Sequence, residues 1–113
     1  MTDCLFCKMV NKEIPTDIVY EDEDILAFKD IAPKAPVHIL IIPKKHIENV
    51  AAASEEDQKV LGKIQIVAQK LAAEFGIADS GYRVLTNSGK DSGQVVFHLH
   101  YHLVGGRVLG DIC

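Results

Sequence analysis

The clearest pattern of hydrophobic positions lies in the middle of the chain and predicts a long amphipathic helix. Apolar residues recur there at spacings of three and four, which places them on one helical face: Val60, Leu61, Ile64, Val67, Ala68, Leu71, Ala72 and Phe75. We expect Ser54 to cap this helix, the acidic residues of 55–57 to favour its first turn, and Gly76 to end it. A shorter helix is expected at 5–10, with Asp3 as its cap.

Shorter apolar runs on both sides of this helix predict β-strands. Five runs rich in β-branched and aliphatic residues are expected to form them: 18–20, 25–28, 38–42, 82–86 and 94–104. Two prolines make 30–36 a loop, and polar residues make 87–93 another. Strands that precede and follow a helix without regular alternation are typical of an α+β fold with a mostly antiparallel sheet, expected here as a single domain over 1–113.

Composition and charge narrow the classes of protein to which the chain can belong. The formal net charge is −4, so the chain as a whole lacks a basic footprint, and nucleic acid is not expected as a partner. The longest apolar stretch, 37–42, is far shorter than the ~20 residues of a membrane span, so no membrane is expected either. Three cysteines, an odd number, do not make a disulfide framework, and without a signal-like start the chain is expected to be cytoplasmic.

Candidate chemistry is concentrated in 97–104, where three histidines alternate with apolar residues. In a strand, His98, His100 and His102 would project to one face, about 6.5–7 Å apart. Such a row could bind a metal ion, or one imidazole could act as a nucleophile. A solvent-facing strand edge whose polar residues happen to be histidines is a third interpretation. Small and polar residues in 87–93 offer backbone N–H groups that can cradle a phosphate, which favours the nucleophile.

Several motifs together resemble the histidine triad (HIT) superfamily. The run His-Leu-His-Tyr-His-Leu-Val at 98–104 matches its His-φ-His-φ-His-φ-φ signature, and four further segments resemble the Hint branch: 26–33, 35–38, 42–46 and 105–107. A third histidine in place of glutamine is unlike the nucleotidyltransferase branch. The Gly-Gly-Arg of 105–107 is unlike the dinucleoside-polyphosphate hydrolases. With its N-terminal Cys-x-x-Cys, the chain is similar to Hint proteins of the bacterial type.

The resemblance implies a fold and an activity. The implied fold is HIT-like α+β: a five-stranded antiparallel sheet with two helices, joined to the sheet of a second copy across a homodimer. The implied activity is that of an adenosine 5′-monophosphoramidase-like hydrolase, which cleaves purine nucleoside phosphoramidates and nucleoside monophosphate esters and releases AMP through a covalent nucleotidyl-histidine intermediate. Three interpretations stay open beside it. These are a non-catalytic purine-nucleotide-binding or interaction protein of the same fold, a dinucleoside polyphosphate hydrolase, and a hydrolase with the three histidines as metal ligands.

The resemblance also implies roles for single residues. His100 would attack phosphorus, His102 would help the leaving group depart, and His38 would belong to a relay behind the triad that His98 completes. The nucleotide would be bound by Asp30 at the ribose, by Asn87, Gly93 and Val95 at the phosphate, and by a base pocket of Phe6, Met9, Phe28, Ile31 and Leu40. Read without the resemblance, the apolar members of this set are ordinary core residues, and His38 is a buried, hydrogen-bonded histidine. Val95 replaces a serine of the eukaryotic Hint proteins, so no hydroxyl assists the leaving group there.

The Cys4-x-x-Cys7 motif is a candidate metal site. A thioredoxin-like redox pair would lie between a strand and a helix of a βαβ unit, which the predicted elements lack. A closed zinc site needs four ligands, and the resemblance to bacterial HIT proteins implies Cys4, Cys7, His46 and His98. Zn²⁺ would then be structural, and catalysis would need no cofactor. The alternative is a pair of free buried thiols.

Overall fold

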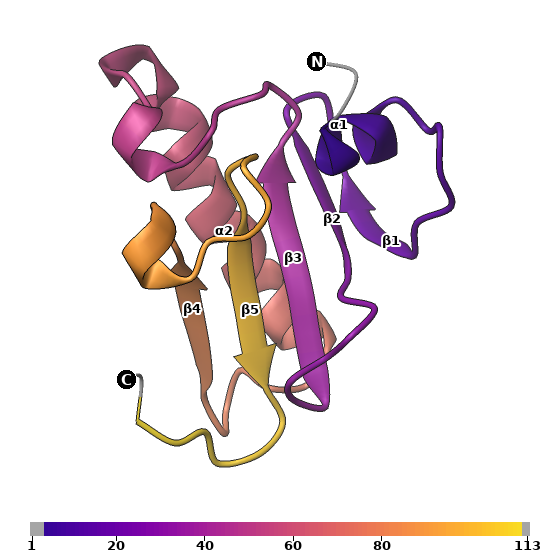
Figure 1. Cartoon of the computed structure of the whole chain (residues 1–113). Helices are drawn as coiled ribbons and strands as arrows, with labels where there is room; N and C mark the ends of the chain where they lie inside the picture. The colour runs from indigo at the N-terminus through magenta and orange to yellow at the C-terminus, as the bar shows by residue number, and fades with distance from the viewer. Residues whose placement is uncertain (1–3, 112–113) are drawn as a thin grey trace.

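A five-stranded antiparallel sheet forms the centre of the fold in the computed structural model, which describes residues 4–111 (Figure 1). The strands are β1 (Ile18–Glu21), β2 (Ile25–Lys29), β3 (Val37–Pro43), β4 (Tyr82–Thr86) and β5 (Tyr101–Gly105). They lie in the order β1-β2-β3-β5-β4, and every neighbouring pair is antiparallel. The predicted α+β fold class is therefore confirmed.

Two helices cover opposite faces of the sheet, because side chains alternate between the faces along each strand. Ile39 and Ile41 of β3 pack with α2 (Gln58–Glu74), whereas Leu40 and Ile42 pack with Phe6 of α1 (Leu5–Val10). The long helix lies behind the sheet in Figure 1 and the short one in front. Neither helix of the described chain combines the length and the apolar character that crossing a bilayer requires.

The helix ends differ in detail from those expected. A 3-10 turn, Glu55–Asp57, precedes α2, and the carboxylate of Asp57 accepts hydrogen bonds from the backbone N–H and the hydroxyl of Ser54. Gly76 follows α2 with a φ of 74°, the left-handed conformation that ends many helices. The cap of α1 is Cys4, whose Sγ accepts a hydrogen bond from the Cys7 N–H. The expected cap, Asp3, lies outside the described residues.

The strand predicted over 94–104 is wrong for most of its length. Only Tyr101–Gly105 forms β5, and 94–100 runs as an irregular segment across the end of the sheet (Figure 1). The reason is that this segment bonds to partners outside the sheet: Leu99 N–H, for example, donates to the carbonyl of Ile47 at 2.6 Å. His98 and His100 therefore do not owe their positions to the alternation of a strand.

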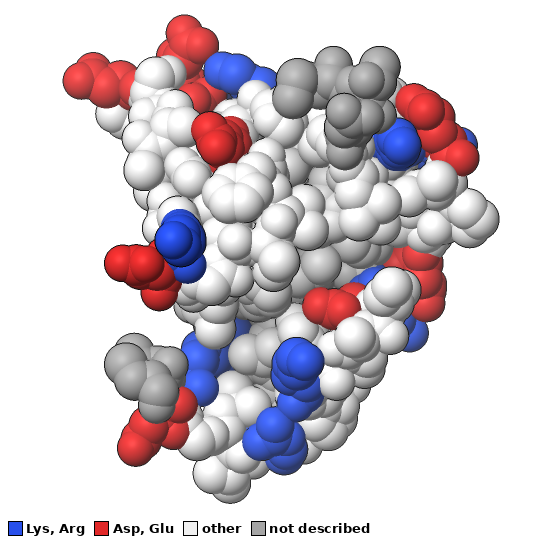
Figure 2. All heavy atoms as spheres, viewed as in Figure 1, with Lys and Arg blue, Asp and Glu red and all other residues white. Residues whose placement is uncertain are grey.

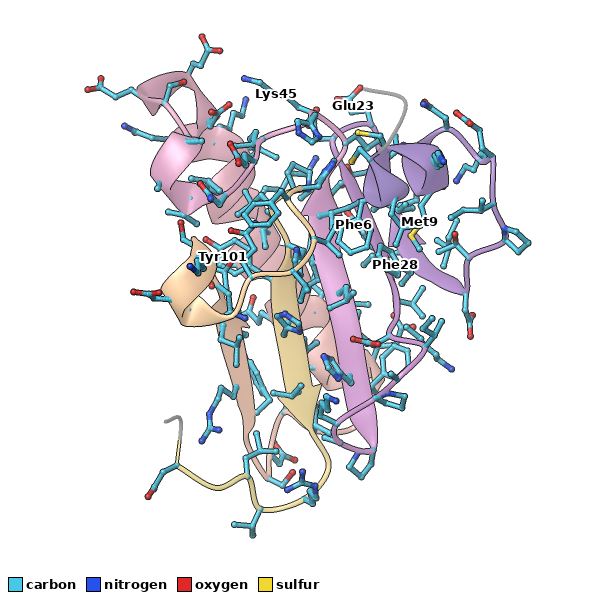
Figure 3. All side chains as sticks on the ribbon, viewed as in Figure 1. Phe6, Met9, Glu23, Phe28, Lys45 and Tyr101 are labelled. Atoms are coloured by element: carbon cyan, nitrogen blue, oxygen red, sulfur yellow. The ribbon has the colours of Figure 1, made fainter. Side chains whose placement is uncertain are left out.

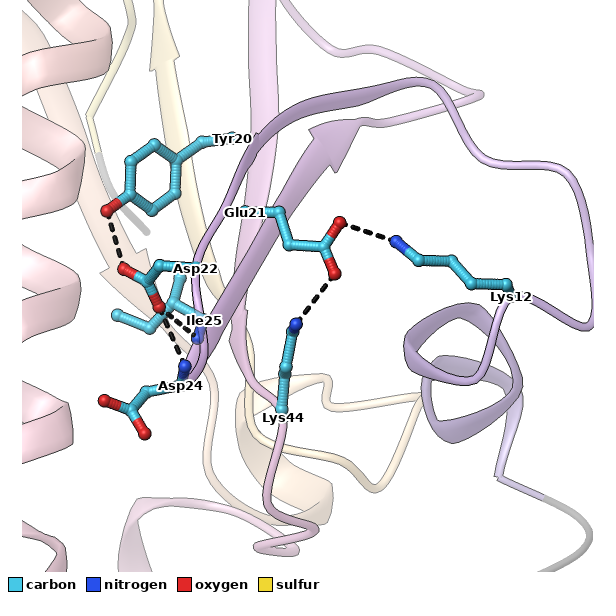
Figure 4. A network of polar contacts seen from close by, with 7 residues as sticks. All are labelled: Lys12, Tyr20, Glu21, Asp22, Asp24, Ile25 and Lys44. Carbon is cyan, nitrogen blue, oxygen red and sulfur yellow. Dashed lines mark hydrogen bonds and ion pairs between the residues drawn. The ribbon is translucent and has the colours of Figure 1, made fainter.

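The acidic turn between β1 and β2 is held by one partly buried carboxylate (Figure 4). Asp22 accepts hydrogen bonds from the Tyr20 hydroxyl at 2.6 Å and from the N–H groups of Asp24 and Ile25 at 2.8 Å. Burial works to raise the pKa of Asp22, but these hydrogen bonds and that from Lys63 outweigh it and lower the pKa to about 2. The charged carboxylate is thus an integral part of the hairpin. Further 3-10 turns occur at Val50–Ala52 and Lys90–Ser92.

Candidate active site and metal cluster

A cleft of about 590 Å³ opens on the face of the sheet that carries α1. Figure 3 shows Phe6, Met9 and Phe28 gathered on its wall beneath the short helix. All five residues expected to form a base pocket line this cleft: Phe6, Met9, Phe28, Ile31 and Leu40. Phe6 and Phe28 are also buried members of the core, whereas Ile31 is 99% exposed. The two phenylalanines are therefore core residues that also form the wall of the cleft, and Ile31 lies at its mouth.

His100 presents one ring nitrogen to this cleft and has the other fixed. Its Nδ1 lies 2.8 Å from the carbonyl oxygen of His98. Since a carbonyl can only accept, Nδ1 must carry the hydrogen, and Nε2 of the neutral ring then bears a lone pair. His100 is buried and lines the cleft, and a neutral imidazole nitrogen with a free lone pair can act as a nucleophile.

His38 and His102 form a hydrogen-bonded pair behind His100. The backbone N–H of Lys34 donates to His38 Nδ1 at 3.0 Å, so the hydrogen of the neutral His38 ring is on Nε2. That Nε2 lies 2.9 Å from Nδ1 of His102, to which it donates. His102 is therefore left with its own hydrogen on Nε2, at the cleft. The Nε2–H donor of His102 thus lies near the Nε2 acceptor of His100, and the centroids of the two rings are 5.1 Å apart.

Burial keeps the histidines of this pair neutral. It lowers the pKa of His102 to about 4, helped by the neighbouring His100 and His38 and opposed by Asp30. Burial also lowers the pKa of His38, and the Asp30 carboxylate opposes it only in part. At neutral pH both rings are uncharged, which is the state that the hydrogen-bond directions above require.

Asp30 lies beside the relay and is oriented by its own loop. One carboxylate oxygen accepts the Ala32 N–H at 2.8 Å, and the other lies 3.4 Å from His38 Nε2. Asp30, His38 and His102 are close enough together to suggest a metal site. Because Lys34 N–H occupies Nδ1 of His38, however, the nitrogen facing Asp30 is the protonated one, which cannot bind a cation. The group is a relay of hydrogen bonds.

A second cleft, of about 360 Å³, meets the first at Asp30 and His102. Asn87 lines this smaller cleft, together with Lys34, Arg83 and Arg107. The face in Figure 2 is largely uncharged at its centre and hollowed below it, and Lys and Arg side chains gather around that lower part.

The residues expected at the phosphate are thus only partly brought together. Val95 is 85% exposed and lines the larger cleft, whereas Asn87 lines the smaller one. Gly93 is in the left-handed conformation, with a φ of 92°, at the end of the 3-10 turn Lys90–Ser92, and it lines neither cleft. The 87–93 loop thus reaches the smaller cleft at Asn87, and the chain reaches the larger one at Val95.

Cys4, Cys7, His46 and His98 come together at the N-terminus of α1. Their ligand atoms lie within 4.8 Å of one another, close enough to bind a metal ion. His98 Nδ1 lies 3.3 Å from Cys4 Sγ, 3.5 Å from Cys7 Sγ and 3.2 Å from His46 Nδ1. A tetrahedral zinc site with bonds of about 2.0–2.3 Å separates its ligand atoms by roughly 3.3–3.8 Å. The donor set and its spacing therefore fit zinc.

The ring of His98 has the tautomer that a metal ligand needs. Its Nε2–H donates to the carbonyl oxygen of Pro43 at 2.8 Å, which leaves a lone pair on Nδ1, facing the thiols. Burial, helped by His46 and His100, lowers the pKa of His98 to about 4, although the Pro43 carbonyl works to raise it. His98 is thus directed away from the cleft, and only His100 and His102 of the three alternating histidines line it.

Two positioning residues were not found from the sequence. Gln94 is buried, and its amide makes four hydrogen bonds: it accepts from Asn49 Nδ2 and Gly89 N–H and donates to the carbonyls of Glu48 and Val96. Thr86 of β4 donates its hydroxyl hydrogen to the carbonyl of His100 at 2.7 Å. Their partners are mostly backbone atoms, which leave no signal in a sequence.

Comparison with known proteins agrees with this geometry. The family model of the HIT domain matches residues 11–109. A purine nucleoside phosphoramidase of Escherichia coli is 48% identical over 108 residues, which are 96% of this chain and 91% of that protein. The structure of a HIT family hydrolase from Legionella pneumophila superposes with a TM-score of 0.94 at 48% identity, over 96% of each chain.

A second solved structure extends the similarity. The HIT family hydrolase of Clostridium thermocellum is 51% identical and superposes with a TM-score of 0.95, over 98% of this chain and 96% of its own. Fold and sequence thus lead to the same family. The chain belongs to the HIT family and, like these relatives, is a hydrolase.

Proposed function

We propose that the protein hydrolyses purine nucleoside phosphoramidates and related nucleoside monophosphate esters, releasing AMP through a nucleotidyl intermediate on His100. The observation that carries the proposal is the hydrogen bond from His100 Nδ1 to the His98 carbonyl, which leaves Nε2 unprotonated at the wall of an apolar cleft. The relative named purine nucleoside phosphoramidase supports this substrate class.

In the first step, Nε2 of His100 attacks phosphorus and a P–N bond forms to the imidazole. The bond from phosphorus to the leaving amine breaks, and the hydrogen of His102 Nε2 passes to that amine. His38, bonded to His102 at 2.9 Å, stabilises the ring that has given up its proton. In the second step, water attacks phosphorus and gives a proton back to His102. The P–N bond to His100 then breaks, which releases AMP and restores the neutral ring.

Binding of the nucleotide follows from the two clefts. The base lies in the apolar cleft beside Phe6 and Phe28, and the Asp30 carboxylate accepts hydrogen bonds from the ribose hydroxyls. The phosphate lies where the clefts meet, with Asn87 and the backbone N–H groups near Gly93 and Val95 as donors. Val95 contributes only its backbone there, since its side chain is apolar.

The Cys4, Cys7, His46 and His98 cluster holds a structural zinc ion in this proposal. When bound, the ion supplies a cross-link between α1 and the rest of the fold, and it takes no part in the reaction. The ligand atoms of the four side chains lie within 4.8 Å of one another, and none of them is the nucleophilic nitrogen of His100.

A homodimer is the second part of the proposal. β4 is the last strand of the sheet, and Tyr82 on it is 39% exposed. A second copy can pair with this edge and continue the sheet, which would cover the unpaired backbone groups of β4. Sedimentation analysis distinguishes the 12.4 kDa monomer from a dimer.

The deciding experiment measures AMP release from adenosine 5′-phosphoramidate by native protein and by His100→Ala. We expect turnover by the native protein and a loss of at least about a thousandfold in the variant, because the nucleophile is gone. Native turnover should persist when a chelator is present in the assay.

Three other outcomes would contradict the proposal. A native protein that binds AMP and has no turnover is a nucleotide-binding module. A native protein that cleaves diadenosine tetraphosphate far faster than the phosphoramidate is a dinucleoside polyphosphate hydrolase. A His100→Ala protein that keeps its turnover excludes the covalent histidine.

A further inference from the structure

Residue 98 joins the metal cluster directly to the nucleophile. Its ring belongs to the cluster, with Nδ1 at 3.3 Å from Cys4 Sγ, and its carbonyl oxygen accepts the hydrogen of His100 Nδ1 at 2.8 Å. The ring is also bonded to the Pro43 carbonyl, so it has little freedom to turn alone. Any change that moves the His98 ring therefore moves the atom that sets the orientation of His100.

Phe6 makes a second connection, through α1. It lies between the two cysteines in the sequence, is 4% exposed, and forms part of the cleft wall. Its ring packs edge-on at 5.2 Å from His100, 5.9 Å from His98 and 5.4 Å from Phe28. A helix of six residues is not stable alone. Its position depends on this packing and on whatever holds Cys4 and Cys7.

We propose that the metal cluster and the nucleotide cleft are energetically coupled, so that metal bound by Cys4, Cys7, His46 and His98 strengthens nucleotide binding and nucleotide strengthens metal binding. The coupling rests on the nucleotide site proposed above. Filling the cleft fixes Phe6 and His100, which restrains α1 and the His98 peptide and so preorganises the ligands. Linkage requires the two effects to be equal in size, and coupling between sites is typically about 5- to 150-fold.

A merely structural cluster makes a different prediction. If the metal only stabilised the whole fold, nucleotide would leave the cluster of an already folded, loaded protein unchanged. The coupling proposed here instead acts within the folded protein, through the Phe6 ring and the His98 carbonyl, which connect the two sites. A measurement on the fully loaded protein therefore separates the two.

The test uses the full chain loaded with Co²⁺, whose visible absorption reports the geometry of a thiolate and imidazole site. We expect saturating AMP to shift this spectrum and to lower the apparent Co²⁺ dissociation constant, measured by competition with a chelator, by at least about fivefold. Calorimetry should show the same factor in the AMP dissociation constant between Zn²⁺-loaded and Zn²⁺-depleted protein. An unchanged spectrum with AMP bound would overturn the proposal, even if the depleted protein unfolds.

Two variants of α1 identify the route. Phe6→Leu removes the ring that contacts both histidines, and we expect the AMP-induced spectral shift to fall at least about threefold at AMP saturation. Val10→Ala is the matched control, because Val10 packs in the same core cluster and does not line the cleft. Equal shifts in the two variants would exclude Phe6 as the connection. If loaded native protein binds no AMP, it is the proposed nucleotide site that fails, whereas binding without any effect of metal overturns the coupling alone.

Discussion

The buried amide of Gln94 offers a direct test of how the loop beside the active site is held. Gln94→Ala removes all four hydrogen bonds of the side chain at once. Their partners belong to three separate segments, around Glu48, Gly89 and Val96. The substitution therefore disconnects the 87–93 loop from the segment that leads into the triad.

The magnitude follows from the number of bonds and their burial. A hydrogen bond contributes about 1 kcal/mol net, and a buried partner left without one costs about 1–3 kcal/mol. Gln94 is 7% exposed, so water replaces its four bonds poorly. We expect a loss of about 4 kcal/mol in the free energy of unfolding. For a chain of this length that corresponds to a fall in Tm of about 15 °C.

Urea denaturation followed by circular dichroism measures this loss. Gln65→Ala is the control, since it removes the same side chain from an exposed position on α2 and should change stability by less than about 0.5 kcal/mol. Gln94→Glu keeps the shape of the side chain but replaces its NH₂ group by a carboxylate oxygen. This oxygen then faces the carbonyls of Glu48 and Val96, to which the amide donated. Those carbonyls raise the pKa of the new carboxyl in the folded state, so the deficit of this variant should grow as pH rises above about 4.

Two results would refute the reasoning. A loss in Gln94→Ala no larger than that in Gln65→Ala would mean that the four bonds add nothing to stability. A Gln94→Glu deficit that does not change with pH would mean that the donors of the amide are not what matters.

Three further predictions concern charge, protonation and backbone. Asp22→Asn should lower the free energy of unfolding by about 2 kcal/mol at neutral pH, since the folded pKa of about 2 lies below the ordinary 3.8. Urea titrations should show this deficit in full above about pH 4 and show it vanishing as pH falls toward 2. Burial lowers the pKa of His102 to about 4, so its titration should contribute no inflection to the pH profile of kcat/KM between about pH 5 and 8; an inflection in that range that disappears in His102→Gln would contradict this. Gly106→Ala should lose about 2–3 kcal/mol in thermal unfolding, because φ is 97° and the new Cβ would lie 2.9 Å from Pro36 Cβ.

Elements with strong internal periodicity were predicted well from the sequence. The apolar stripe of α2 and the runs of β2 and β3 depend on burial of their own side chains, so the pattern identifies them. The same logic failed at 94–100, where alternating histidines imitate a half-buried strand. That segment is held by distant carbonyls such as Ile47 and by the Gln94 amide, and no local pattern encodes such partners.

In the candidate site, too, part of the arrangement was predicted from the sequence and part was not. The alternation of the three histidines left a metal site and a nucleophile open, the polar loop 87–93 favoured the nucleophile, and the resemblance supplied both the phosphoryl chemistry and the ligand set of the cluster. The resemblance also implied that His98 belongs to the cluster, whereas His100 and His102 act on the phosphate; what the sequence did not reveal is how the backbone directs the His98 ring to the cluster and the other two rings to the cleft. This separation depends on the bends of the backbone at 96–98 and on the hydrogen bond between His100 Nδ1 and the His98 carbonyl, which only the folded chain shows.

The distance along the chain between the cluster's members bears on how the protein is made. Cys4 and His98 are 94 positions apart, and Cys7 and His46 are 39 apart. During synthesis Cys4 and Cys7 precede β2 and β3, the surface on which α1 packs. Six residues do not hold a helix on their own. α1 therefore cannot reach its place before β3 has been made, and the two thiols meet their last cluster partner only after His98 has been made.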